Sequence, residues 1–279
     1  IYCIGERKLK KKCIVYGNCQ TEPIRKYLMA SSTFNRIYTM IYVPSIHRCN
    51  HETGLDQQYL KTLYDCDLFI YQKVSQSYNY YLSSDYMLER LPSKCMKISF
   101  TNSYFSGYYP QYMHKKLYPY ADKNIIKLLN EGCSKEEIIS ILSDDNFYSY
   151  DEVKTNLENT IQELKRRDTE LDITLDDYIE QNYKDIQLFY TINHPSYHII
   201  QYLTMKILDK LEIPKIEISR IRLKDVHFKD HVHPIYPSVI KHLNLNFIKS
   251  EDKSFILNHI PLTFHDYLAK QIDFLKPIL

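Results

Sequence analysis

The sequence predicts an α/β fold with a mostly parallel, doubly wound sheet, a helical insertion and a helical C-terminal part. Short apolar runs rich in β-branched and aromatic residues alternate with segments of helical periodicity, and the turns between them are short. This alternation is typical of parallel sheets, whose crossovers are right-handed. The expected strands are residues 13–16, 36–43, 67–72, 95–100 and, after a long helical stretch, 188–192.

Capping residues and apolar periodicity indicate where the helices lie. Ser134 opens a capping-box sequence, Asp151 is the expected N-cap of a long helix, and Thr174 resembles a third cap. The pattern is helical from about residue 120 to residue 186. Amphipathic segments complete the set of expected helices: 22–29, 56–64, 84–91, 197–211 and 263–275.

These elements predict four parts along the chain. They are a basic lead-in (1–11), the first part of the α/β core (12–112), a helical subdomain (113–187), and the completion of the core with a C-terminal helical region (188–279). A chain of 279 residues is long enough to bury a substantial core without disulfides or metal ions.

Charge and composition argue against several classes of protein. The net charge is only +2, so no overall field favours nucleic acid. No apolar run approaches the roughly 18 residues of a membrane span, which leaves peripheral membrane association open. The seven cysteines are an odd number without paired spacing, and this favours a reducing, cytoplasmic location over a secreted disulfide scaffold.

The turn after the first expected strand is the leading candidate for chemistry. Gly17, Asn18, Cys19 and Gln20 lie between a buried strand and a helix. In parallel sheets this edge is where ligands bind. The positive end of the helix dipole there is expected to lower the pKa of the Cys19 thiol. The Asn18 side chain and the backbone amides after Gly17 are expected to stabilise an oxyanion.

His194 is the candidate base for this cysteine. It lies in a turn directly after the strand expected at 188–192, and a nucleophilic cysteine needs a spatially adjacent histidine. Two histidine-rich segments, around His47 and around His231, lack standard zinc spacings, so no metal site is expected.

Phosphate-binding glycine loops are absent from the sequence. The chain has only 5 glycines and neither a Walker motif nor a G-x-G-x-x-G fingerprint. The phosphates of a coenzyme would instead need helix N-termini or side chains such as Arg25 and Lys26.

Four short motifs in series resemble the WcbI-type polysaccharide biosynthesis family. The resemblance covers roughly residues 12–210, and the order and approximate spacing of the motifs agree with the family. The motifs are VYGNCQ (15–20), IYQ (70–72), FSGYYPQ (105–111) and FYTINHP (189–195).

This resemblance implies an acetyltransferase of capsular or surface polysaccharide assembly that uses coenzyme A. The reaction would move an acetyl group from acetyl-CoA to a sugar hydroxyl of the acceptor. Cys19 and His194 would form the catalytic pair. The implied oxyanion or substrate-binding residues are Gly17, Asn18, Gln20, Gln72, Gly107, Tyr108 and Asn193.

A looser similarity to SGNH-type esterases adds an alternative. It implies an SGNH/flavodoxin-like core, with Cys19 in place of the esterase serine. Thr191 stands three residues before His194, where those esterases have aspartate, so a third triad member is in doubt. A carbohydrate esterase therefore stays open. So does a non-catalytic glycan-binding module built on the aromatic loop at 104–112.

Two mechanisms fit the catalytic pair. Cys19 attacks acetyl-CoA and the sugar hydroxyl resolves the thioester, or His194 deprotonates the hydroxyl for direct attack while Cys19 shapes the pocket.

Overall fold

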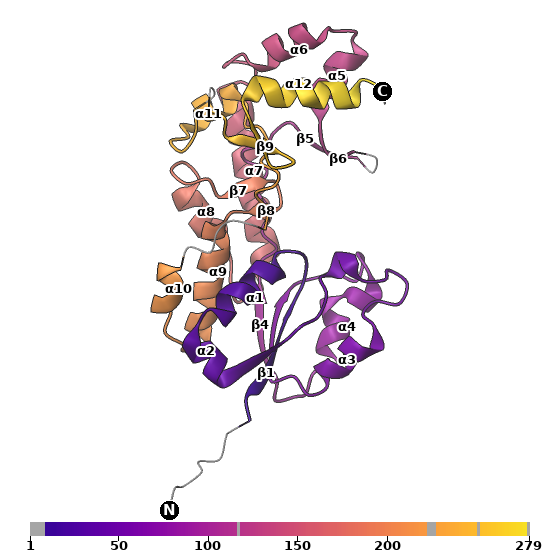
Figure 1. The fold of residues 1–279 in the computed structure, drawn as a ribbon, viewed down its shortest axis with the longest axis vertical. Helices are drawn as coiled ribbons and strands as arrows, with labels where there is room; N and C mark the ends of the chain where they lie inside the picture. Colours follow the sequence, from indigo (N-terminus) through magenta and orange to yellow (C-terminus); the bar gives the residue numbers. More distant parts are fainter. Residues whose placement is uncertain (1–8, 116–117, 222–226, 250–251, 278–279) are drawn as a thin grey trace, which may run out of the picture. The chain divides into compact units, whose positions relative to one another are not determined.

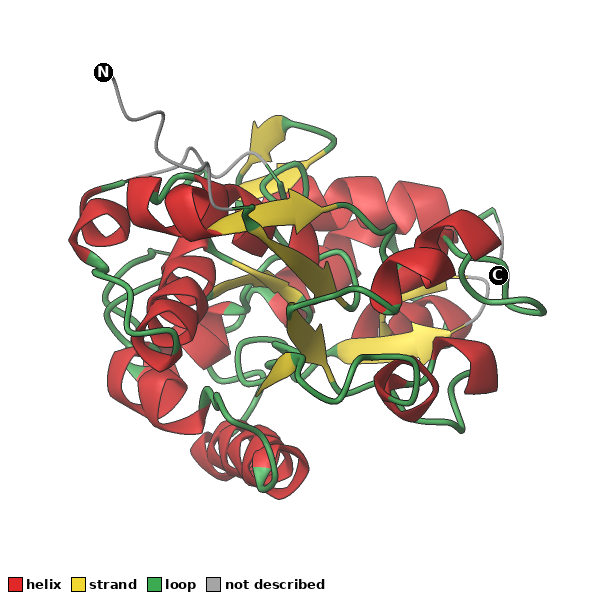
Figure 2. Cartoon of the chain, turned by 90° about the horizontal axis from the view of Figure 1, so that it is seen from below, coloured by secondary structure: helices red, strands yellow, loops and turns green. Residues whose placement is uncertain are grey.

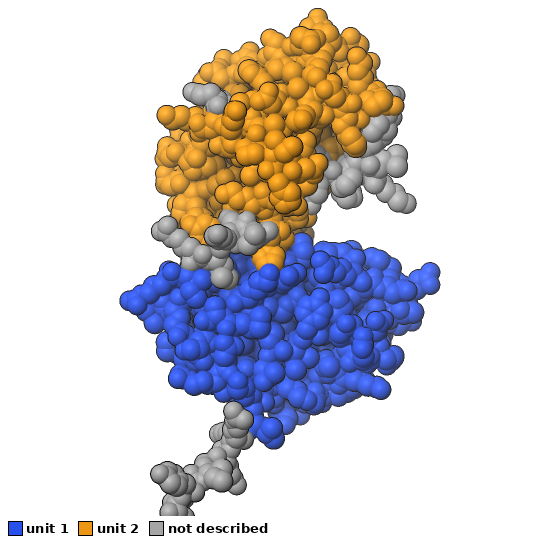
Figure 3. Space-filling model, viewed as in Figure 1, with its two compact units in different colours: residues 1–102, 170–174, 199–223 blue, residues 103–169, 175–198, 224–279 orange. Residues whose placement is uncertain are grey.

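The computed structural model describes residues 9–115, 118–221, 227–249 and 252–277. Most of the basic lead-in expected at 1–11 therefore lies outside the described residues. The chain forms two compact units (Figure 3). Unit 1 comprises residues 1–102, 170–174 and 199–223, and unit 2 comprises 103–169, 175–198 and 224–279. Helices make up most of the regular structure in the described chain (Figure 2).

Unit 1 is built on a four-stranded parallel sheet with the order β2-β1-β3-β4. The central strand β1 pairs with β2 on one side and with β3 on the other. The strand order therefore reverses between β1 and β3, and ligands of open α/β sheets bind outside the carboxyl ends of the strands at such a point. The strands are β1 (Lys11–Tyr16), β2 (Tyr38–Ile41), β3 (Leu68–Gln72) and β4 (Met96–Phe100).

Helices cover both faces of this sheet. In Figure 1, α1 (Thr21–Met29) and α2 (Ser32–Ile37) lie on one side, and α3 (Gln57–Leu63) and α4 (Ser84–Leu88) lie on the other. Ile14, Tyr16 and Phe69 belong to one buried cluster with Leu63 of α3 and Met87 of α4. Two short 3₁₀ turns (Ile46–Arg48 and Tyr80–Leu82), α10 (Ile216–Arg220) and most of α9 (Tyr197–Lys210) complete unit 1.

Unit 2 is mainly helical, with short antiparallel strand pairs. Its longest helix, α7, has the buried residues Val153, Leu157, Ile161 and Leu164 at helical spacing. The helices of unit 2 are α5 (Lys123–Asn130), α6 (Lys135–Leu142), α7 (Tyr150–Asp168), α8 (Asp176–Asn182), α11 (Pro237–Leu243) and α12 (Phe264–Leu275). The strand pairs are β5 (Tyr112–Lys115) with β6 (Tyr118–Asp122), β7 (Phe189–Thr191) with β8 (His194–Pro195), and β9 (Phe255–Leu257) with β10 (Ile260–Leu262).

The parallel α/β sheet expected from the sequence is confirmed for the first four strands, and several boundaries are corrected. The strand expected at 188–192 forms β7, which pairs antiparallel with β8 in unit 2 and does not join the parallel sheet. Residues 36 and 37 end α2 instead of opening a strand, because the Ser31 hydroxyl accepts a hydrogen bond from Phe34 N and starts a helix there. The long helix is capped by Ser149, with Glu152 completing the capping box, and Asp151 lies inside it. The hairpin of β5 and β6 extends to residue 122, where helix was expected from about 120.

The capping box at Ser134 is confirmed, whereas Leu175 and not Thr174 precedes α8. The finer likeness to an SGNH or flavodoxin core stays a prediction. No helix in the described part of the chain is both long enough and apolar enough to cross a membrane.

Candidate active site

The turn after β1 is shaped by Gly17 and the side chain of Gln72. Gly17 has a φ of +149°, a conformation that residues with a side chain rarely adopt. A Cβ atom on Gly17 would lie 2.4 Å from Oε1 of Gln72, which extends from the end of β3. Glycine is therefore required twice, by the backbone angle and by the close approach of the glutamine.

Three consecutive backbone N–H groups of the turn all donate to side-chain acceptors of unit 1. Asn18 N donates to Gln72 Oε1 (2.8 Å), Cys19 N donates to His47 Nε2 (3.0 Å), and Gln20 N donates to Asn18 Oδ1 (2.9 Å). The sequence predicts free oxyanion donors here. In the structure each of these donors already has a partner, so any of them must exchange that partner to bind an oxyanion.

Buried amides connect the ends of three neighbouring strands. Gln72 is 2% exposed, and its Nε2 donates to Gln20 Oε1 (2.9 Å) and to Thr101 O (3.5 Å), just after β4. Nδ2 of Asn18 donates to Asn102 Oδ1 (2.8 Å). The Gln72 amide is buried and has lost its hydration, so its two bonds are costly to break, whereas the bond between Asn18 and Asn102 is exposed. The network holds Cys19 in a fixed turn at the edge of the sheet where the strand order reverses.

The Cys19 thiol has a raised pKa, which is the opposite of the sequence expectation. Desolvation by burial is the largest cause and outweighs backbone hydrogen bonding and the charge of Arg48, both of which lower the pKa, while Glu22 raises it further. The helix terminus offers less than expected because the N–H groups of Thr21 and Glu22 donate to Asn18 O and Cys19 O. Cys19 is therefore mainly a neutral thiol near pH 7.

His47 contacts this turn, and no sequence pattern marked it as a partner of Cys19. It lies in the 3₁₀ turn Ile46–Arg48, and Ile46 N donates to Gly17 O (2.9 Å), which anchors this turn to the end of β1. Desolvation, and then the charge of Arg48, lowers the pKa of His47. The neutral imidazole that results can accept the N–H of Cys19. The spacing of His47, Cys49 and His51 drew attention to this loop, although no group of three metal-ligand side chains gathers among the described residues.

Arg25 also differs from its expected role. It is 5% exposed, and its Nη1 donates to Val15 O and Val43 O, both at 3.1 Å. These bonds join β1 to the segment after β2, and they explain how the charged guanidinium is tolerated in a buried position. Lys26 forms a surface ion pair with Glu22 at 3.6 Å. The exposed cation beside Cys19 is therefore Arg48 and not Arg25.

His194 and Asn193 belong to the β7–β8 pair of unit 2. His194 pairs with Thr191 across the two strands, and the Thr191 hydroxyl lies 3.1 Å from Asn193 Oδ1. The His194 ring stacks on Phe228, with a centroid distance of 4.8 Å and an interplanar angle of 10°. Cys19 belongs to unit 1 and His194 to unit 2, so their pairing stays a prediction.

Gly107 and Tyr108 are buried inside unit 2. The Tyr108 side chain is fully buried, and its hydroxyl donates to Tyr183 O at 2.6 Å. A Cβ atom on Gly107 would lie 2.3 Å from the Phe105 ring. These contacts account for both residues through packing, and we leave them out of the proposed site.

Comparison with known proteins identifies relatives of the whole architecture. A family model described as polysaccharide biosynthesis enzyme WcbI matches residues 12–215. One solved structure, described as WcbI, a novel polysaccharide biosynthesis enzyme, matches with a TM-score of 0.83 and 21% sequence identity, over 96% of this chain and 91% of that chain. That structure is described as native protein without a disulfide bond between coenzyme A and one of its cysteines. No curated protein matches the sequence.

Proposed function

Because the chain belongs to the WcbI family of polysaccharide biosynthesis enzymes, we propose that it transfers an acetyl group from acetyl-CoA to a sugar hydroxyl. The acceptor would be a capsular or surface polysaccharide or its precursor. The observation that carries this proposal is the position of Cys19, in the tight turn after β1 where the strand order reverses. The reaction is expected in the cytoplasm, as the unpaired cysteines of the sequence suggest.

The link to coenzyme A rests on the described relative and on the side chains around Cys19. The relative is described by reference to a disulfide bond between coenzyme A and a cysteine. We propose that Cys19 takes the corresponding place, next to the thiol end of the coenzyme. Arg48 is exposed, its charge acts on Cys19, and among the described residues no carboxylate lies within ion-pair distance of it. A guanidinium in this position suits the phosphates of the coenzyme.

The covalent route requires deprotonation of the Cys19 thiol. The thiolate would attack the acetyl carbonyl, the bond from the acetyl carbon to the coenzyme sulfur would break, and the proton would go to the departing thiolate of CoA. The sugar hydroxyl would then attack the thioester on Cys19, with His194 accepting the hydroxyl proton. The bond from the acetyl carbon to the Cys19 sulfur would break, and the released thiolate would take up a proton to restore the thiol. The raised pKa of Cys19 makes the first step costly, because little thiolate is present near pH 7.

The direct route places less demand on the thiol. His194 would take the proton of the sugar hydroxyl, the hydroxyl oxygen would attack the acetyl carbonyl, and CoA would leave as its thiol after protonation. Cys19, Gln72 and the amides of the turn would shape the acetyl site. The protonated state of Cys19 favours this route.

Mass spectrometry of the protein after incubation with acetyl-CoA alone separates the two routes. The direct route predicts unmodified Cys19, whereas an added acetyl group on Cys19, absent from a Cys19→Ala control, establishes the covalent route. Transfer of labelled acetyl groups to a polysaccharide acceptor tests the function itself. Release of acetate from acetylated glycan without CoA would instead show the esterase.

A further inference from the structure

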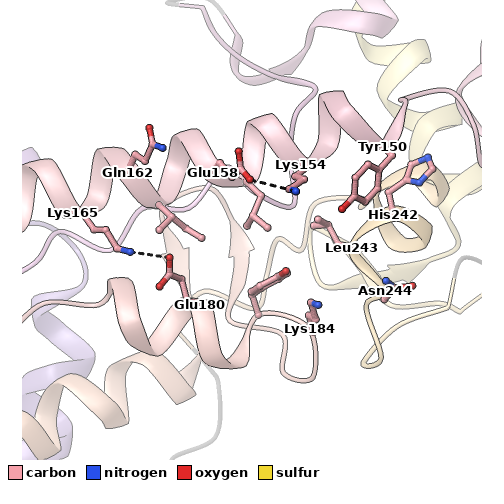
Figure 4. A pocket seen from close by; sticks show the side chains of 13 residues that line it. Tyr150, Lys154, Glu158, Gln162, Lys165, Glu180, Lys184, His242, Leu243 and Asn244 are labelled. Carbon is pink, nitrogen blue, oxygen red and sulfur yellow. Dashed lines mark hydrogen bonds and ion pairs between the residues drawn. The ribbon is translucent and has the colours of Figure 1, made fainter.

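Unit 2 contains a pocket of about 540 Å³ that the chemistry described above does not use. Figure 4 shows α7 along one side, with α8 and the residues after it on the other, and the C-terminal end of α11 nearby. The volume falls in the range of about 300–1,000 Å³ that is typical of pockets for small ligands.

The residues at the bottom of this pocket are apolar, but they expose little apolar surface to a ligand. Leu157 and Ile161 of α7 and Leu243 of α11 line it, and they are only 8%, 7% and 4% exposed. Most of their area is already packed inside unit 2. A lipid or a strongly apolar peptide would therefore find few apolar atoms here, and the accessible lining belongs to rings and polar side chains.

Two tyrosines and a lysine supply that accessible lining. Tyr150 is 52% exposed and Tyr183 is partly exposed, so both rings remain accessible at the pocket. Tyrosine combines an apolar ring face with a hydroxyl, a combination suited to a sugar ring with its own apolar face and hydroxyls. The Lys184 ammonium lies 5.7 Å from the centre of the Tyr183 ring, and charge and ring are thus adjacent.

The charges of the lining leave one cation without an acidic partner. Glu158 pairs with Lys154 at 3.9 Å, and Glu180 pairs with Lys165 at 2.9 Å, as the dashed lines in Figure 4 show. Within the described chain no carboxylate lies within ion-pair distance of Lys184. The pocket therefore favours a ligand that carries a negative charge.

We propose that this pocket binds a segment of an acidic oligosaccharide. Sugar rings pack on Tyr150 and Tyr183, a sugar carboxylate pairs with Lys184, and the polar groups of Gln162 and Asn244 bond to hydroxyls. The saccharide class follows from the family of the chain. The inference rests on the proposed function only in treating this saccharide as the acceptor, because binding is measurable without any transfer.

A tryptophan reporter tests the pocket directly, since the chain has no tryptophan of its own. Tyr183→Trp places one fluorophore in the pocket, and Tyr64→Trp places one at a 62% exposed tyrosine of unit 1 as the control. Titration with oligogalacturonate, a chain of uronic acids, is expected to give a saturable fluorescence change with Tyr183→Trp and none with Tyr64→Trp. Thermal unfolding of both variants verifies that they are folded.

The charge requirement is tested in the Tyr183→Trp background. Lys184→Gln is expected to weaken oligogalacturonate binding by about ten-fold, the value of one charge-assisted hydrogen bond. Lys127→Gln, a 72% exposed lysine of α5, is expected to leave binding unchanged. A neutral maltooligosaccharide is expected to bind more weakly than oligogalacturonate.

Three results would overturn the proposal: no saturable signal with oligogalacturonate, equal or tighter binding of the neutral chain, or an affinity that is insensitive to Lys184→Gln. Coenzyme A binding, measured on the same variants by calorimetry, is expected to be unchanged. Absence of oligogalacturonate binding to Tyr183→Trp, with intact coenzyme A binding, would thus refute the pocket alone. Saccharide binding without any coenzyme A binding would refute the proposed transfer but not the proposed pocket.

Discussion

The turn after β1 and the pocket along α7 differ in how their polar groups are used. In the turn, the N–H groups of Asn18, Cys19 and Gln20 each have a partner inside unit 1, and Gln72 is almost fully buried. In the pocket, the polar groups are long exposed side chains in surface ion pairs, and Lys184 has no acidic partner among the described residues.

The residues of the turn are thus expected to contribute both to stability and to catalysis. The residues of the pocket are expected to contribute to ligand binding alone. Substitution of a buried, fully bonded turn leaves polar groups without partners and costs stability. Substitution of an exposed ion pair costs little, because water and salt already screen it. The substitutions below test this contrast, and their effects are expected to decrease in the order given.

His194→Gln is expected to have the largest effect, on the rate of acetyl transfer. Removal of a general base lowers kcat by about 10²–10⁴-fold, because the sugar hydroxyl then attacks without losing its proton.

Tyr150→Ala in the pocket is expected to raise the KM for the acceptor and leave kcat nearly unchanged. Steady-state kinetics measures both effects, and His265→Gln, at an exposed histidine of α12, is the control. A wild-type kcat in His194→Gln would contradict the assignment of His194 as the base.

Gly17→Ala is expected to have the largest effect on stability. Its φ of +149° strains any side chain, and the new Cβ would lie 2.4 Å from Gln72 Oε1, so the free energy of unfolding should fall by about 3 kcal/mol. Gly132→Ala is the matched control, with a φ of +82° and no atom within 4 Å of a new Cβ, and it should cost only about 1 kcal/mol. Urea unfolding measures both, and equal losses would argue against the close approach of Gln72.

His47→Phe removes the acceptor of the Cys19 N–H and should cost about 0.5 kcal/mol, a low value because His47 is exposed. The lowered pKa of His47 means that the unfolded chain takes up the proton first as the pH falls. The contribution to stability is therefore complete above about pH 6.5 and is lost as the pH falls below that value. The amide resonance of Cys19 should shift over this pH range in the wild type and stay constant in His47→Phe. A wild-type resonance that does not respond to pH would refute the contact.

Glu180→Gln breaks the ion pair with Lys165 and is expected to have the smallest effect. Both side chains are more than 40% exposed, and such pairs contribute little to stability. The free energy of unfolding should match that of the wild type within experimental error. A clear loss in urea unfolding would show that this pair holds α7 and α8 together, and would remove the contrast between pocket and turn.

Local patterns in the sequence predicted the single strands and the turn, because both depend on neighbouring residues. The strand at Leu68–Gln72 and the helix after Gln20 follow from short apolar runs and from helical periodicity. His47 was missed as a partner because it lies 28 residues after Cys19 in a polar loop, where nothing local marks the contact. The raised pKa of Cys19 was missed for the same reason, since burial depends on the whole of unit 1.

The pocket was missed because its residues have no common motif. In the sequence, the solvated face of a long helix is the ordinary interpretation of Lys154, Glu158 and Lys165. That face lines a pocket only because α8 and the end of α11 pack against α7. Gly107 and Tyr108 are the converse case: a motif marked them and the fold buries both, so their role at the site stays a prediction.

Calorimetric titration of the full chain with coenzyme A and with acetyl-CoA tests the central claim most directly. Saturable binding of both is expected, with weaker binding when Arg48 is replaced by Gln and unchanged binding when the exposed Arg166 of α7 is replaced instead. Absence of binding for both ligands would contradict acetyl transfer at Cys19.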